Sequence, residues 1–148
     1  MALRKPLVQV GGKIQQIQPG DTLSATFAEI EGQVWTNGDA GNHVIGDIVY
    51  LNSADNVKKA KADASGTADA IAIATATIVN ATTGTYQTSG VLAGLSGLTA
   101  GARYFLSAGT AGLLTSTAPS TVGQLVVEIG IAISTTELLI RIQPAILL

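Results

Sequence analysis

Apolar residues recur at every second position near the C-terminal end of the chain, at Leu125, Val127, Ile129, Ile131 and Ile133. Successive side chains of a β-strand point to opposite faces, so this alternation is typical of a strand with one buried face. A polar turn at 134–136 leads into a second alternating run, at Leu138, Ile140 and Ile142. We therefore predict a hairpin of residues 125–133 and 137–143, with the odd-numbered residues of its first strand facing the core.

The rest of the chain shows the same pattern of short strands. Further strands are predicted at 7–10, 13–17, 46–51, 71–79 and 103–106, separated by turns rich in Gly, Pro, Asn and Thr. Residues 23–35 are also compatible with a strand, and residues 57–62 fit either a short helix or a strand with a lysine face. No segment has a convincing helical period. We predict an all-β fold, a β-sandwich or jelly-roll-like single domain over 19–148, preceded by an extended N-terminal arm.

A faint internal repeat runs through this pattern. Gly46 precedes Tyr50 and Leu51 by the spacing at which Gly101 precedes Phe105 and Leu106, an offset of 55 residues. The alternating residues 71–79 match residues 125–133 at an offset of 54, which places one insertion between the two pairs. Two copies of a strand–turn–strand unit suit two sheets packed face to face. Chance agreement between β-rich segments explains the match equally well.

The first 18 residues form either an arm or the first hairpin of the domain. Gly11-Gly12 between two apolar runs is a two-residue hairpin signal, and Pro6 disfavours a helix before it. As an extended arm, the segment would add a strand to the exposed sheet edge of a partner. The candidate contact residues for that partner are Leu3, Arg4, Lys5, Pro6, Leu7, Val8 and Val10.

The chain is poor in charge for its apolar content. Charged residues make up 12% of it and hydrophobic residues 47%, whereas a typical soluble domain has about 25% charged residues. One domain of this size cannot hide so much apolar surface. We therefore expect other copies of the chain to cover part of it, in a homotrimer.

Composition also argues against several partners. The net charge is −2 and the longest basic run is Lys58-Lys59, so no nucleic-acid partner is expected. No stretch reaches the roughly 18 apolar residues of a membrane helix, and no apolar segment behind Arg4-Lys5 suggests a cleaved signal peptide. The absence of cysteine excludes disulfides and thiolate metal sites.

No residue pattern indicates an enzyme, a cofactor or a metal. The single histidine, His43, is expected in an exposed loop without a nucleophile placed beside it. Residues 37–42 resemble a calcium loop, but the twelfth position holds no carboxylate whether counted from Asn37 or from Asp39, so a turn is expected. Trp35 beside this loop suits a partly buried core residue better than a sugar-stacking platform. We expect no small-molecule substrate.

Several stretches are similar to proteins of tailed bacteriophages. They are residues 7–17, 19–23, 46–51, 94–107, 112–115, 123–126 and 129–132 together with Pro119, and they cover most of the chain except about 24–45 and 52–69. These stretches resemble a module of phage head decoration proteins, also called capsid cement proteins, which some tail-fibre proteins share. The segment from Trp35 to His43 departs from the module, so no residue role is transferred there.

The resemblance implies a structural protein of the virion. It implies a trimer on the capsid surface that binds the phage major capsid protein and cements neighbouring capsid subunits, with residues 1–18 as the capsid contact. The alternative is a tail-fibre or baseplate component that recognises a host receptor. The length of 148 residues leaves little room for both a fibre shaft and a receptor-binding tip, which favours the capsid.

Overall fold

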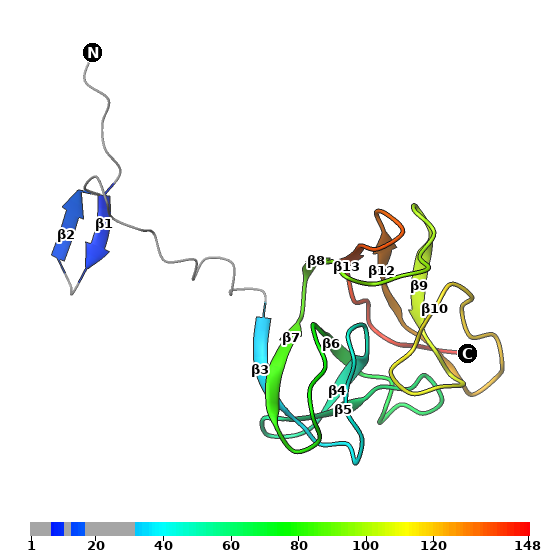
Figure 1. The fold of residues 1–148 in the computed structure, drawn as a ribbon. Helices are drawn as coiled ribbons and strands as arrows, with labels where there is room; N and C mark the ends of the chain where they lie inside the picture. Colours follow the sequence, from blue (N-terminus) through cyan, green and yellow to red (C-terminus); the bar gives the residue numbers. More distant parts are fainter. Residues whose placement is uncertain (1–6, 11–12, 17–31) are drawn as a thin grey trace.

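The computed structural model describes residues 7–10, 13–16 and 32–148 (Figure 1). All regular structure in these residues is β, and no helix occurs among them, which confirms the predicted all-β class. The strands are β1 (Leu7–Val10), β2 (Lys13–Gln16), β3 (Gly32–Asn37), β4 (Ile48–Ser53), β5 (Asn56–Lys59), β6 (Ala70–Ala74), β7 (Thr83–Gln87), β8 (Gly90–Leu92), β9 (Arg103–Leu106), β10 (Leu114–Thr115), β11 (Leu125–Val126), β12 (Glu128–Ala132), β13 (Leu138–Ile140) and β14 (Ile146–Leu147).

Four groups of strands make up the described fold. β1 and β2 pair antiparallel, with Val10 opposite Lys13, as the hairpin signal predicted. The strands of a closed barrel follow the order β3, β5, β4, β6 and β7. Of the two alternatives for residues 57–62, a helix or a strand, β5 supports the strand. β10, β9, β12, β13 and β8 form an open five-stranded sheet, and β11 pairs with β14. The predicted C-terminal hairpin is confirmed for β12 and β13, which pair antiparallel, whereas residues 125–126 of its first strand belong to β11.

The open sheet repeats the architecture of the barrel. Its order β10-β9-β12-β13-β8 is the order β5-β4-β6-β7-β3 of the barrel strands, with β8 corresponding to β3. Tyr104 of β9 pairs with Gly130 of β12 as Val49 of β4 pairs with Ala72 of β6, so these strands recur at offsets of 55 and 58 residues. The internal repeat is therefore real, but its second offset is 58 and not the expected 54. Alternation alone could not detect the difference, because both values are even and keep the same faces.

Matching backbone hydrogen bonds support this correspondence. Gly46 and Gly101 precede β4 and β9 with φ of +91° and +81°, a conformation that glycine adopts without steric cost. Gly46 donates its N–H to the carbonyl of Ala74 at 3.0 Å, and Gly101 donates to that of Ala132 at 2.7 Å. The fold therefore contains two repeated units. The first is the barrel of β3 to β7, and the second begins at β8 and contains the open sheet. The two glycines start equivalent strands in these units.

A one-residue bulge in β12 changes which side chains are buried. Two residues of β12 face one residue of β9 at this point, and the additional residue is Ile129. Val127 and the bulge residue Ile129 are buried, and after the bulge Ala132 is buried. Ile133 is 49% exposed. The prediction that all odd positions face the core is therefore correct up to Ile129 and wrong after it, because Ile131 is only half-buried and Ile133 is half-exposed.

Two hydrophobic clusters hold the described fold together. The inward side chains of the barrel form one, made of Val49, Val57, Ala72, Ala74, Ile78 and Tyr86. The other joins Ile48 and Ile73, on the opposite face of β4 and β6, to Leu106, Val127 and Ile129 of the second unit. This shared cluster packs the two units against each other.

Candidate interaction surfaces

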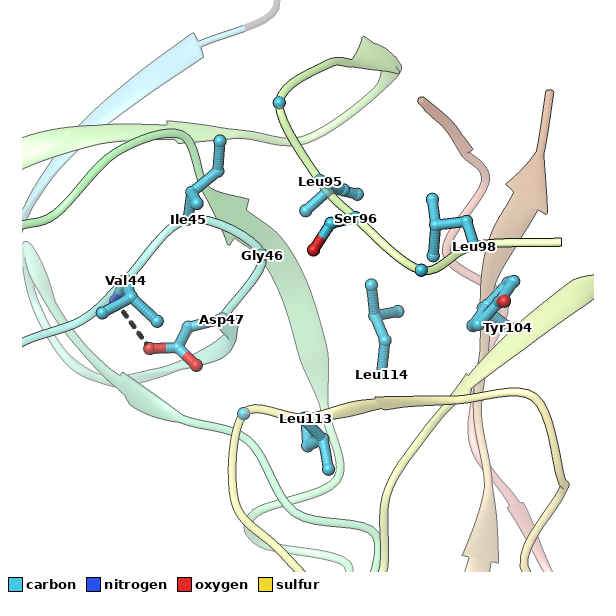
Figure 2. A pocket seen from close by; sticks show the side chains of 13 residues that line it. Val44, Ile45, Gly46, Asp47, Leu95, Ser96, Leu98, Tyr104, Leu113 and Leu114 are labelled. Carbon is cyan, nitrogen blue, oxygen red and sulfur yellow. Dashed lines mark hydrogen bonds between the residues drawn. The ribbon is translucent and has the colours of Figure 1, made fainter. Parts of the chain in front are cut away.

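A cleft of about 320 Å³ lies where the barrel meets the second unit (Figure 2). Three segments line it, residues 44–47 before β4, residues 94–98 after β8 and residues 112–114 around β10, together with Tyr104 of β9. Most of these residues are apolar or glycine, and the side chains of Leu95, Leu98 and Leu114 lie close around the cleft in Figure 2. The cleft therefore suits an apolar group.

The cleft exists because the second unit is not closed as the barrel is. In the barrel, residues 36–37 of β3 pair in parallel with residues 56–57 of β5. The repeat places residues 95–96 and 113–114 at the corresponding positions of the second unit. These residues line the cleft, and β8 and β10 remain the end strands of their sheet.

The path of the chain after β8 keeps this gap open. Gly94, with φ of +87°, turns the chain there. The backbone N–H groups of Leu95 and Leu98 then donate to the carbonyls of Thr136 and Thr135, each at 3.1 Å. Residues 95–98 are thus tied to the turn between β12 and β13 instead of to β10.

The one acidic side chain in the cleft wall is already engaged. One carboxylate oxygen of Asp47 accepts the backbone N–H of Val44 at 2.7 Å and lies 2.8 Å from the ammonium group of Lys59. A carboxylate neutralised in this way has little need of a cationic ligand. The cleft is therefore best matched by an uncharged ligand.

The C-terminal strand carries an exposed apolar surface. Ile146 and Leu147 of β14 are 65% and 68% exposed, and Val122, near the start of β11, is 88% exposed. Successive residues of a strand face opposite sides, so β14 is uncovered on both faces. These three side chains are free to contact another molecule.

A chain of three polar side chains connects the loop after β3 to β7. The Nδ1 atom of His43 lies 2.8 Å from the hydroxyl of Tyr86, and its Nε2 atom lies 2.8 Å from a carboxylate oxygen of Asp39. In the neutral tautomer with its proton on Nε2, this N–H donates to the carboxylate and Nδ1 accepts from the hydroxyl of Tyr86. His43 is fully buried. The expectation of an exposed loop histidine is therefore wrong, and the reason is a tyrosine 43 residues away in the sequence.

In the second unit, leucines occupy the positions that correspond to His43 and Tyr86. Leu98 lies three residues before Gly101 as His43 lies before Gly46, and Leu138 faces Ala132 as Tyr86 faces Ala74. Both leucines are buried. Tyr86 is fully buried like His43, so this hydrogen-bonded pair belongs to the interior of the fold.

Alkaline pH should weaken the fold through Tyr86. Burial of its hydroxyl, together with the carboxylates of Asp39 and Asp47, raises the pKa of Tyr86 to about 12. In the unfolded chain the hydroxyl loses its proton near pH 10. The contribution of Tyr86 to the free energy of unfolding is therefore fully present below pH 10, and it falls by about 3 kcal/mol as the pH rises through 12. Urea unfolding of Tyr86→Phe beside the unchanged protein checks this result.

At pH 7 we expect Tyr86→Phe to cost about 1–2 kcal/mol, because Nδ1 of His43 loses its partner. The variant has no hydroxyl to ionise at this position, so the deficit should disappear above pH 10 and change sign by pH 12. The half-buried Tyr50 provides a control, Tyr50→Phe, for the loss of a hydroxyl at neutral pH. A deficit that stays constant to pH 12 would contradict the role of Tyr86.

The remaining predicted features fall in different places. Leu3, Arg4, Lys5 and Pro6 lie outside the described residues, and Leu7, Val8 and Val10 lie on β1, whose side chains are not described. Trp35 is half-buried with its ring 6.0 Å from that of Tyr86, as expected of a core residue. The turn after it is held by Asn37, which donates to the carbonyls of Gly41 and Ile78.

The described residues contain no group of three His, Cys, Asp or Glu side chains that could hold a metal ion. No helix long and apolar enough to cross a membrane occurs in them. Neither a family model, nor a curated protein, nor a solved structure matches the chain.

Proposed function

We propose that this chain is a structural protein of a phage virion. It binds the outer surface of the capsid, contacts the major capsid protein and cements neighbouring subunits, without catalysing a reaction. The observation that carries the proposal is the exposed apolar surface of a chain with few charges, which suits permanent burial in an assembly. The resemblance of residues 94–107 and the other similar stretches to capsid decoration proteins supplies the identity of the partner.

The arrangement of the two units fits a cement protein. Their shared apolar cluster, formed among the described residues, supports a β-sandwich-like body. β1 and β2 pair with no other strand in the described part of the chain. A two-stranded hairpin is marginally stable alone, so a partner surface would stabilise it. We propose residues 1–18 as the capsid contact, with three copies giving the avidity of linked arms.

A tail-fibre or baseplate component that recognises a receptor remains the second candidate, because the same modules occur in heads and tails. Immunogold labelling of virions separates the two. Dense label over the head supports the capsid proposal. Label confined to the tail tip would refute it and support receptor recognition.

Deletion of residues 1–18 should separate binding from folding. We expect the truncated protein to keep its β-type circular dichroism spectrum, because β1 and β2 form a sheet of their own and pair with no strand of the barrel or the open sheet. Its affinity for capsids stripped of this protein should fall by tenfold or more, which is about 1.4 kcal/mol or more. Co-sedimentation with stripped capsids measures the affinity.

The control for this deletion is Val79→Asp, a change at an exposed barrel residue that leaves residues 1–18 intact. It should bind like the unchanged protein. Unfolding or aggregation of the truncated protein would place the segment in the core and refute the arm.

A further inference from the structure

We propose that the cleft of the second unit receives the C-terminal segment, residues 144–148, of a second copy of this chain. The inference extends the self-association in the proposed function by naming the two surfaces that meet. Both lie among the described residues. One is the cleft between β8 and β10, and the other is the exposed strand β14 with the residues beside it.

The internal repeat indicates that a strand belongs in this cleft. In the barrel, the end of β3 lies along β5 and closes the wall with parallel backbone pairing. In the second unit the corresponding segment is turned away after Gly94, and β10 pairs only with β9. An extended segment placed beside β10 would supply the missing neighbour, as in recognition by strand addition.

The chemistry of residues 144–148 matches the cleft. The sequence Pro-Ala-Ile-Leu-Leu has no charged side chain, and the cleft wall offers leucines and an acidic group that is already neutralised. Ile146 and Leu147 present apolar side chains on both faces of β14, so one could enter the cleft while the other covers its rim. Val44 and Leu113 at this rim are themselves half-exposed.

β14 is also available to a neighbour. Its pairing with β11 covers two residues, and its other edge is unpaired in the described fold. None of its residues lines the cleft of its own chain. The donor and the acceptor are therefore different surfaces, and their contact is head-to-tail. Such contacts close into rings when the rotation permits, so a trimer would satisfy every cleft and every β14.

Disulfide cross-linking tests the contact, because the chain has no cysteine of its own. Leu147→Cys and Ser96→Cys are prepared as full-length proteins with different tags, mixed, allowed to exchange subunits and oxidised. We expect a covalent heterodimer that carries both tags on a non-reducing gel. Leu147→Cys mixed with Val79→Cys is the matched control, because Val79 is exposed on the barrel outside the cleft.

Three outcomes would overturn the proposal. The first is a yield equal to that of the control. The second is a link that forms only within one chain when a further variant carries both Leu147→Cys and Ser96→Cys. The third is a dominant link between two copies of the Leu147→Cys variant, which would mean that β14 strands pair with each other.

A second measurement does not depend on oxidation. Leu147→Asp should raise the dissociation constant of the oligomer about tenfold in light scattering, as expected for a central apolar contact, with an unchanged circular dichroism spectrum. Val79→Asp should leave the constant unchanged, and equal values for both variants would refute the contact. Both measurements use purified protein without capsids. Their failure would refute this contact only. Capsid binding is tested separately, by the deletion of residues 1–18.

Discussion

Replacement of Ile129 by aspartate should prevent the chain from folding. The side chain is fully buried in the cluster that joins the two units. Removing it costs about 2–5 kcal/mol in lost packing, and burying an unpaired carboxylate adds several kcal/mol. Together these reach the roughly 5–15 kcal/mol that stabilise a typical domain. Circular dichroism after refolding from urea should show an unfolded chain.

Two neighbouring changes serve as controls for Ile129→Asp. Glu128→Ala removes an ion pair with Arg103, whose side chain is 66% exposed, and should cost no more than about 1 kcal/mol. Ile133→Asp lies beyond the bulge at a half-exposed position and should also be tolerated. Strict alternation predicts equal damage at 129 and 133. That result would contradict the bulge.

The second large effect is expected from Gly130→Ala. An added Cβ would collide with the carbonyl oxygen of Leu139, on the neighbouring strand β13. That atom belongs to the backbone and cannot move without disturbing the pairing of β12 with β13. We expect a loss of about 3 kcal/mol, as for severe overpacking, measured as a lower urea midpoint.

Gly66→Ala is the matched control, because nothing lies within 4 Å of its added Cβ. A Gly-to-Ala change at an unstrained site also reduces the entropy of the unfolded chain, so the control should be neutral or slightly stabilising. Equal urea midpoints for the two variants would show that β12 and β13 are not as close as described.

Only some of the candidate surfaces could be predicted from the sequence. Residues 1–18 are a local pattern, and their role as an arm stays a prediction. The cleft was missed because its walls come from segments before β4, after β8 and around β10, none of which is unusual alone. The internal repeat was the signal that could have found it. Aligning 95–96 with 36–37 reveals an equivalent place, but only the pairing of β3 with β5 shows that one copy is closed there and the other open.

Local chemistry determined the strands of this protein, and tertiary pairing determined their faces and neighbours. The alternation of residues 125–133, the turn at 134–136 and the glycines before β4 and β9 set strand type and several boundaries, because these are properties of a few adjacent residues. The sequence could not show that one extra residue at Ile129 moves the buried face from odd to even positions, since a bulge exists only relative to a partner strand. The burial of His43 could not be predicted either, because its partner, the hydroxyl of Tyr86, comes from a strand that is distant in the sequence. Closure of one unit and not the other is likewise decided by long-range pairing, which no local pattern encodes.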